Sequence, residues 1–212
     1  MYRFNKILII GAHYDDTELG VGGTAARLIH EGKEVYKITL TNNEVYSEDM
    51  KLNIKAARAK ENSMESSKTL GIIEVDFPTQ PFGKLEYDKG YMMELEHFII
   101  CNDIDTVFLH YLEDYQTDHL AAHKISKTAA RHCRNILMYQ SNPYLMQNNF
   151  LPNFFVDISE YIEIKKMALM CYDPEQDLQG RLFETTINRN SIWGYGNHVA
   201  YAEGFQSIKM CI

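Results

Sequence analysis

The sequence predicts an α/β protein with a Rossmann-like three-layer fold, in which helices cover both faces of a mostly parallel sheet. Short continuous apolar runs such as residues 6–12 are typical of strands that are buried on both faces. Helical patterns alternate with these runs through the first two-thirds of the chain. The length of 212 residues suits one domain, and no repeat or linker divides it. We therefore expect a single domain over residues 1–212.

The elements follow one another in a regular order. The first run ends at His13, and the helix after it is expected to stop at Gly32, because glycine readily ends a helix. Strands are expected at 6–12, 35–41, 74–77, 106–110, 135–140 and 154–158, with a last extended piece at 201–210. Helices are expected at 18–32, 50–70, 91–101, 119–133, 161–172 and 178–188, and a loop at 78–90.

Composition and charge narrow the class of protein. Hydrophobic residues make up 45% and charged residues 24%, as in soluble globular proteins. The formal net charge of −8 argues against nucleic acid or an anionic membrane as a partner. No apolar run approaches the roughly 20 residues of a membrane span. The four cysteines form no close pair, and the N-terminus has the pattern of a first strand, so we expect a cytoplasmic protein with reduced thiols.

Ionisable residues cluster where two of the predicted strands end. His13, Asp15 and Asp16 follow the first strand, and Asp118 and His119 come shortly after the strand at 106–110. Ligands of such sheets bind at the carboxyl ends of the strands. The two clusters are therefore expected to meet at one edge of the sheet.

The two clusters together favour a zinc site. Imidazole and carboxylate are good zinc ligands, and a turn can aim His13 and Asp16 at one point. His119 would supply a third ligand, which leaves a fourth position open, as in catalytic sites. Either cluster alone would more often be a polar helix start, because aspartate caps free amides there. Asp15 lies between two ligands, where a general base should stand.

At this point the motifs resemble those of a known family, the PIG-L/LmbE-like N-deacetylases. Residues 12–24 (AHYDDTELGVGGT) resemble its A-H-P-D-D-x-E-L-G-x-G-G-T signature. Arg58 and Glu61 precede a Leu-Gly pair as in the family, residues 114–119 (DYQTDH) resemble D-x-H-x-D-H, and residues 201–205 (YAEGF) resemble Y-A-E-x-F. The resemblance spans nearly the whole chain in the right order.

The resemblance implies a Rossmann-like zinc hydrolase that removes an acyl group, such as acetyl, from the nitrogen of a small sugar-like substrate. It implies His13, Asp16 and His119 as the zinc ligands, although another divalent metal stays open. It also implies Asp15 as the general base, Glu18 in a supporting role and Asp118 as an aspartate beside the last ligand. The glycines at 20, 22 and 23 would allow close helix–sheet approach, since they follow the helix start and form no dinucleotide fingerprint.

Two positions depart from the family pattern. Tyr14 replaces the proline, which removes backbone stiffness but no ligand. Gln116 replaces a histidine that stabilises the oxyanion or protonates the leaving amine in the family. Glutamine can donate a hydrogen bond to an oxyanion but cannot give up a proton at neutral pH. Asp15, His198 and His110 are the candidate proton donors.

Two competing hypotheses remain beside the deacetylase. Because of Gln116, the chain could be a weakened or inactive family member that only binds metal or sugar. A nucleotide-binding oxidoreductase ranks well below, because Gly11 opens no G-x-G-x-x-G motif and Asp15 and Asp16 would repel a pyrophosphate. The sequence leaves open the identity of the sugar, the acyl group and the oligomeric state. A homo-oligomer is compatible with it.

Overall fold

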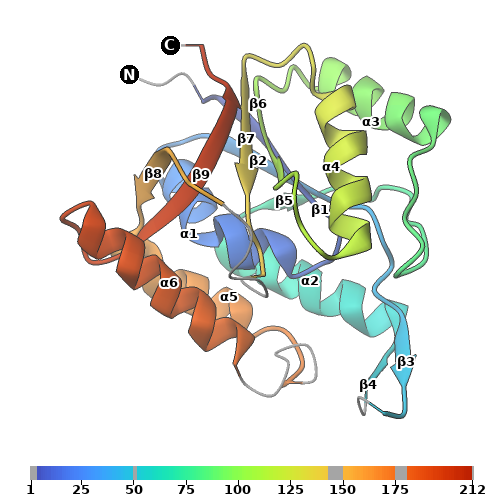
Figure 1. Ribbon diagram of the computed structural model, residues 1–212, viewed down its shortest axis with the longest axis horizontal. Helices are drawn as coiled ribbons and strands as arrows, with labels where there is room; N and C mark the ends of the chain where they lie inside the picture. The colour runs from blue at the N-terminus through green and yellow to red at the C-terminus, as the bar shows by residue number, and fades with distance from the viewer. Residues whose placement is uncertain (1–3, 50–51, 143–149, 175–180, 212) are drawn as a thin grey trace.

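A computed structural model shows a mostly parallel seven-stranded sheet covered by helices on both faces, as the sequence predicts (Figure 1). It describes residues 4–49, 52–142, 150–174 and 181–211. The strands of the sheet stand in the order β5-β2-β1-β6-β7-β9-β8, and β3 pairs with β4 in a separate hairpin.

Most of the expected elements are present with bounds that differ by a few residues, apart from the helices expected over 50–70 and 178–188. The strands are β1 (Lys6–Gly11), β2 (Glu34–Thr39), β3 (Val45–Ser47), β4 (Leu52–Ile54), β5 (Ile73–Glu74), β6 (Thr106–His110), β7 (Asn135–Tyr139), β8 (Phe154–Asp157) and β9 (Ala202–Lys209). The helices are α1 (Asp16–His30), α2 (Ala56–Leu70), α3 (Lys89–Cys101), α4 (Thr117–Ala129), α5 (Ile162–Leu169) and α6 (Leu182–Gly196), with a 3₁₀ turn η1 (Ser159–Tyr161) before α5.

The order of the strands places a switch point between β1 and β6. From β1 the chain moves outward through β2 to β5, then returns to the other side of β1 and continues through β6 to β7. All of these pairs are parallel, whereas β9 runs antiparallel to both β7 and β8. Ligands of open α/β sheets bind beyond the carboxyl ends of the strands at such a point. The loops after β1 and β6, which carry the two ionisable clusters, meet there.

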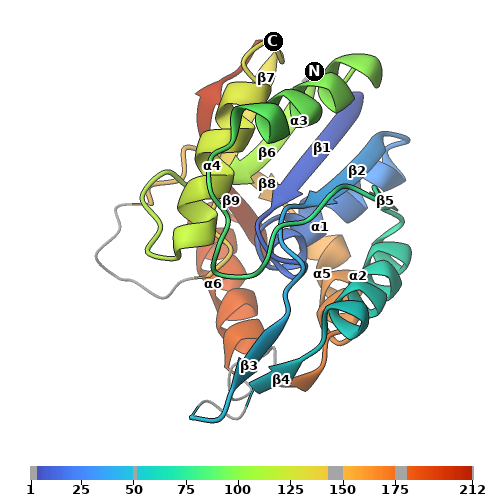
Figure 2. The same cartoon turned by 90° about the vertical axis from the view of Figure 1, so that its right-hand side faces the viewer.

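Two apolar cores lie on opposite faces of the sheet. Successive side chains of β1 point to opposite faces of the sheet. Leu8 and Ile10 pack against α3 and α4 on one face, and Ile7 and Ile9 pack against α1 and α5 on the other. Figure 2 shows the sheet between these two helical layers. Because both faces are covered, the central strands read as continuous apolar runs in the sequence.

Helix α1 approaches the sheet closely, as its glycines suggest. A Cβ on Gly20 would come within 2.2 Å of the Tyr139 ring, and one on Gly23 within 2.7 Å of Ile158. A Cβ on Gly22 would make only ordinary contact at 3.4 Å. The fully buried Glu203 of β9 accepts hydrogen bonds from the backbone of Gly23 and Thr24. The glutamate of the last family-like motif therefore fastens β9 to α1.

The segment expected as one helix over 50–70 is different in the structure. Residues 52–54 form β4 of a short hairpin with β3, and α2 begins only at Ala56 after the extended Lys55. The hairpin projects from the body at the lower right of Figure 1. The sequence Leu-Asn-Ile fits a helix as well as a strand, and cross-strand pairing with residues 45–47 decides for the strand.

The helix expected over 178–188 is longer and begins later. Helix α6 continues to Gly196, while residues 178–180 lie outside the described residues. Gly194 does not end the helix, because it is packed where a Cβ would lie 2.6 Å from the carbonyl oxygen of Ala200. A glycine that serves close packing carries the same sequence signal as one that stops a helix.

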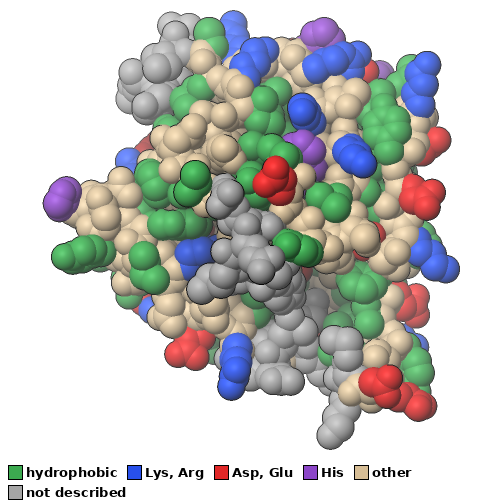
Figure 3. All heavy atoms as spheres, viewed as in Figure 1, with side chains coloured by type: hydrophobic (Ala, Val, Ile, Leu, Met, Phe, Trp, Pro, Cys, Tyr) green, Lys and Arg blue, Asp and Glu red, His purple; other side chains and the backbone are tan. Residues whose placement is uncertain are grey.

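The described surface mixes apolar and charged side chains, and Figure 3 shows both signs interspersed over one face. Within the described residues, no helix has both the length and the apolar character needed to cross a bilayer.

Candidate active site

The first cluster lies in the tight turn between β1 and α1. The backbone N–H of His13 donates to Asp16 Oδ2 at 2.7 Å, which closes the turn. Gly11 makes this turn feasible, since a Cβ there would lie 2.7 Å from the carbonyl oxygen of His13. His13 is 6% exposed and Asp16 is fully buried. The turn thus directs one imidazole and one carboxylate to the same point.

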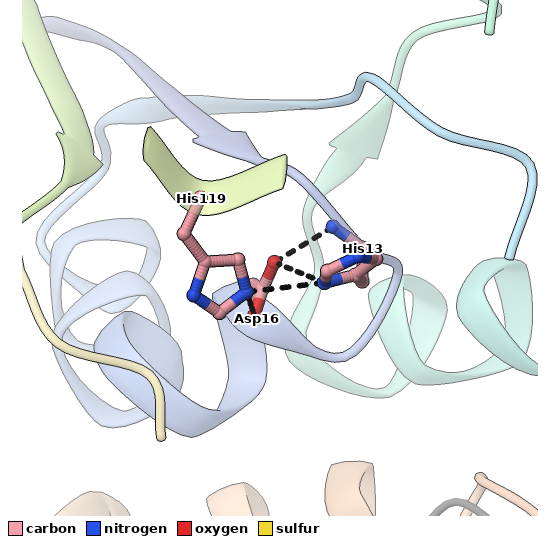
Figure 4. Close-up of side chains that lie close together, drawn as sticks. All are labelled: His13, Asp16 and His119. Atoms are coloured by element: carbon pink, nitrogen blue, oxygen red, sulfur yellow. Dashed lines mark hydrogen bonds and ion pairs between the residues drawn. The ribbon is translucent and has the colours of Figure 1, made fainter. Parts of the chain in front are cut away.

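The second cluster adds His119 from the first turn of α4. Its Nε2 lies 3.1 Å from His13 Nδ1 and 3.2 Å from Asp16 Oδ1, and His13 Nδ1 lies 3.4 Å from Asp16 Oδ2 (Figure 4). Zinc bonds of 2.0–2.1 Å in a tetrahedron place neighbouring ligand atoms about 3.3 Å apart. The three side chains therefore already stand at the mutual spacing that a divalent cation requires.

An unpaired carboxylate oxygen supports the same reading. Asp16 Oδ1 is buried and has no hydrogen bond of good geometry among the described residues. Burial of such an atom without a partner is costly. Asp16 nonetheless stays ionised, because the positive charge of His119 outweighs burial and holds the Asp16 pKa well below the usual range. A cation between the three ligands would satisfy this oxygen.

Asp114 orients His119 from behind. Its Oδ2 lies 2.9 Å from His119 Nδ1, so a proton on Nδ1 leaves Nε2 free to face His13 and Asp16. Burial opposes the charging of His119, but Asp16 and Asp114 outweigh it and raise its pKa to about 10. A second trio of potential ligands, His110, Asp114 and His119, lies within the same 4.8 Å limit but reuses this oriented imidazole.

His110 is a neutral structural histidine. It is fully buried at the end of β6, and its Nε2 accepts the backbone N–H of Ala12 at 2.9 Å. Its ring stacks on that of His119 with the centroids 4.1 Å apart. Burial, reinforced by the charge on His119, lowers its pKa to about 4. A group with this pKa is deprotonated at neutral pH and cannot serve there as a proton donor.

Asp15 stands at the N-cap of α1 but makes no capping hydrogen bond with its side chain. It is half-buried, unlike its neighbour Asp16. Burial and the negative charge of Asp16 raise its pKa to about 6. Its carboxylate is therefore both free of structural duty and basic for an aspartate, which suits a general base.

Gln116 caps α4 in a way that fixes its amide. Its Oε1 accepts hydrogen bonds from the backbone N–H groups of Asp118 and His119, so its NH₂ group must face the other way. That group lies 3.2 Å from His13 Nε2. The amide thus presents a donor at His13 Nε2, the ring nitrogen opposite the Nδ1 that faces Asp16 and His119.

Asp118 links the ligand cluster to the loop after β5. Its Oδ2 lies 3.2 Å from His13 Nε2, and its two oxygens accept the backbone N–H groups of Gly83 and Leu85. Burial would raise the Asp118 pKa, but these hydrogen bonds lower it. Phe82 lies in the same loop. The centroid of its ring is 5.0 Å from that of the His13 ring, and the residue is 36% exposed.

The structure does not bring His198 to this cluster. It lies exposed in the turn between α6 and β9, with a backbone φ of 60°, and its N–H bonds to the carbonyl of Tyr195. The other six predicted site residues do lie in or beside the ligand trio: His13, Asp15, Asp16, Gln116, Asp118 and His119.

Several residues that shape the site were not singled out from the sequence. Lys37, in the middle of β2, is fully buried and bonds to Glu18 and to the backbone of Tyr14. A lysine inside an apolar strand was a signal for such a role. Phe82 and Tyr172 carried none, because an aromatic residue in a loop or at a helix end usually packs.

The family model of the GlcNAc-PI de-N-acetylases (PIG-L) matches residues 8–130. The chain is 28% identical over 170 residues to the uncharacterized deacetylase YaiS of Escherichia coli (strain K12). The aligned region covers 77% of this chain and 88% of YaiS.

Solved structures show the same fold. The N,N'-diacetylchitobiose deacetylase of Pyrococcus horikoshii superposes with a TM-score of 0.79 at 20% identity, over 96% of this chain and 84% of that one. GalB, the 4-carboxy-2-hydroxymuconate hydratase of Pseudomonas putida KT2440, gives 0.79 at 19% identity, over 98% of both chains. One fold therefore carries both a deacetylase and a hydratase, so the reaction must be argued from the site.

Proposed function

The chain belongs to the PIG-L family of de-N-acetylases, and from that membership we propose that it hydrolyses an N-acetyl amide on an amino sugar with zinc as its cofactor. The observation that carries the proposal is the close approach of His13 Nδ1, His119 Nε2 and the two Asp16 oxygens, at 3.1–3.4 Å, with Asp16 Oδ1 buried and without a hydrogen bond among the described residues. An N-acylated sugar of small size is the substrate class. Membership of the family implies amide hydrolysis. The metal, the sugar and the roles of the residues are proposed in addition.

The chemistry of the donors favours zinc. Two imidazole nitrogens and one carboxylate oxygen form the three-ligand set of hydrolytic zinc sites, which leaves one position for substrate or water. When bound there, zinc would polarise the amide carbonyl and make the attacking water more acidic. His13 Nδ1, Asp16 and His119 Nε2 would hold it, while Asp114 and Asp118 fix the two rings from their far sides.

Asp15 is proposed as the general base. It takes a proton from water as the new C–O bond forms at the amide carbon. The same proton then passes to the leaving nitrogen as the C–N bond breaks, so the products are acetic acid and the amine, which at neutral pH become acetate and the ammonium form of the amine. Its pKa of about 6 lies between those of a strong base and a strong acid, as both transfers require.

Gln116 is proposed to stabilise the oxyanion. Its NH₂ group is turned toward the His13 ring, 3.2 Å from Nε2, because its carbonyl oxygen is held by two backbone N–H groups. A donor whose direction is fixed before the reaction stabilises developing negative charge without reorganisation. Phe82 offers the exposed apolar surface beside His13 on which a sugar or acyl group can lie.

A purely binding role is the competing function. It is disfavoured by Asp15, because this half-buried carboxylate has a raised pKa and makes no capping hydrogen bond, neither of which a binding module needs. A nucleotide-dependent oxidoreductase is also disfavoured, since Gly20 and Gly23 lie within α1 against Tyr139 and Ile158 and not at a pyrophosphate turn.

Acetate release tests the proposal directly. The purified chain, loaded with one equivalent of zinc, is incubated with N-acetylglucosamine, its nucleotide- and lipid-linked forms, and short chitooligosaccharides. We expect release from at least one member and none after chelation, with recovery on adding zinc. A chain that binds one zinc but hydrolyses none of these, nor longer N-acyl analogues, would be a binding module, and the proposal would be wrong.

A further inference from the structure

The catalytic turn of this chain contains a tyrosine where the family signature has proline, and the structure shows what holds that tyrosine. The N–H of Tyr14 donates to Asn43 Oδ1 at 3.3 Å. Its carbonyl oxygen accepts two hydrogen bonds, from Lys37 Nζ and from the Tyr172 hydroxyl, each at 2.7 Å. Both peptide groups that flank Tyr14 are therefore held by side chains from other elements.

The three holding side chains come from distant places and have no other common target. Asn43 follows β2, Lys37 lies within β2, and Tyr172 follows α5. All three are buried, and Tyr14 itself is 5% exposed. Asn43 has a φ of 53°, a left-handed conformation that asparagine tolerates better than most residues. A strained residue in a loop indicates that its side chain is needed where that backbone places it.

Lys37 is committed entirely to this part of the fold. An ammonium group has three donors, and those of Lys37 reach the Tyr14 carbonyl, Glu18 Oε1 at 2.9 Å and Ser63 Oγ at 2.9 Å. Its pairing with Glu18 links the turn to the motif glutamate of α1. The supporting role expected for Glu18 thus takes a concrete form, since it neutralises the lysine that holds the turn.

We propose that Asn43, Lys37 and Tyr172 form a clamp on the Tyr14 peptide groups that replaces the stiffness of the missing proline and sets the direction of His13 and Asp15. Proline restrains this backbone through its ring and has no N–H, whereas tyrosine needs a partner for its N–H and a restraint on its carbonyl. The clamp supplies both. The three side chains are positioning residues, because they touch neither the ligand trio nor the open position. This inference rests on the proposed function for its catalytic readout only.

The first test removes one hydroxyl. Tyr172→Phe deletes one donor to the Tyr14 carbonyl and leaves the ring in place. We expect the Kd for zinc, measured by chelator competition, to rise about 10-fold, and kcat to fall about 10-fold with KM within a few-fold, the usual range for an outer-shell partner. Tyr161→Phe is the matched control, since that hydroxyl bonds to His30 far from the turn. It should change neither quantity.

The second test is a rescue that a merely structural role does not produce. Asn43→Gly deletes the acceptor of the Tyr14 N–H yet accepts the positive φ. It should weaken zinc binding as Tyr172→Phe does. Tyr14→Pro in the Asn43→Gly background removes the orphaned N–H and restores the ring, so zinc affinity and kcat should recover toward wild type. A double variant no better than Asn43→Gly would overturn the proposal.

Lys37 is tested with its charge partner. Lys37→Met alone would leave Glu18 ionised and unpaired in the interior, and such a variant could fail to fold. The pair Lys37→Met with Glu18→Gln keeps volume and neutrality, so we expect a folded chain with the same loss of zinc affinity. Unchanged zinc affinity in this pair and in Tyr172→Phe would overturn the clamp. If zinc affinity responds as expected while the wild type hydrolyses no amide, the clamp stands and the proposed function fails.

Discussion

His13 Nδ1 and His119 Nε2 lie 3.1 Å apart although the two residues are 106 positions apart in the chain. Two imidazole nitrogens at this distance need either one shared proton or a common cation. Asp16 and Asp114 overcome burial and raise the His119 pKa to about 10, and Asp118 and Asp16 likewise raise that of His13. Without metal the pair therefore holds a proton at neutral pH, and a metal must displace it.

Zinc binding should release close to one proton or more at pH 7. The sign follows from the pKa: below about 10 the metal-free His119 is charged, and a ligand nitrogen must be neutral. Two histidines of ordinary pKa would together release only about half a proton. Affinity should therefore rise about 10-fold per pH unit from pH 7 toward 9. Calorimetry in buffers of different ionisation enthalpy counts the protons, and a count near one half would contradict this protonation state.

His13→Ala should abolish tight zinc binding. The substitution removes one of three ligand atoms and the partner of Asp118 Oδ2, whereas the backbone N–H that closes the turn stays. Metal content after dialysis is the measurement, and His132→Ala, an exposed histidine on the surface after α4, is the control. One tightly held equivalent in His13→Ala would place the metal elsewhere.

Asp15→Asn should keep the zinc and slow hydrolysis by about 10²–10⁴, the usual range for loss of a general base. Its side chain makes no capping hydrogen bond, so little stability should be lost. The checks are kcat on any accepted substrate, zinc content and Tm. Activity within a few-fold of wild type would remove Asp15 from the mechanism.

Phe82→Ala should act on substrate binding more than on the chemical step. The ring is 36% exposed next to His13, and its backbone is held by Asn42, so the loop should keep its shape. We expect KM to rise about 10-fold with kcat within a few-fold, the signature of lost uniform binding. Tyr87→Ala, an exposed aromatic in the same loop, is the matched control. An equal rise in both variants would deny Phe82 a specific contact.

Much of the fold could be predicted because the central strands are buried on both faces. Ile7 to Ile10 are all inaccessible, so the first strand appears as a continuous apolar run. The hairpin over residues 45–54 could not be predicted, because its strands are three residues long and half-exposed, which leaves no periodic signal.

The clustering of His13, Asp16 and His119 could be predicted, because two of the three residues are close in the chain and the motifs that contain them are specific. The supporting residues could not, because their contacts are set by tertiary structure. Lys37 and Asn43, from β2 and the loop after it, and Tyr172, which follows α5, converge on the two peptide groups that flank Tyr14, and no short motif holds them together. His198 shows the converse limit: its nearness to the last motif along the chain does not bring it near the metal ligands in space.

Gln116 offers the sharpest test of the mechanism, because one amide performs two separable tasks. Its Oε1 caps α4, and its NH₂ group is turned toward the His13 ring. Gln116→Glu keeps a cap acceptor and replaces the donor with a carboxylate of nearly the same shape. If the NH₂ group stabilises the oxyanion, this variant should lose at least 10²–10³ in kcat/KM, about 2.7–4 kcal/mol, while Tm and zinc content hold.

Gln116→Ala and Gln116→His complete the series. Gln116→Ala loses both donor and cap, so it should be as slow as Gln116→Glu and also about 1 kcal/mol less stable. Gln116→His restores a donor that also titrates near neutral pH, so activity should persist and gain a new pH-dependent limb. The measurement is kcat/KM against pH for all three variants. If Gln116→Glu is as active as the wild type, the amide only caps the helix, and the oxyanion must be stabilised by another group.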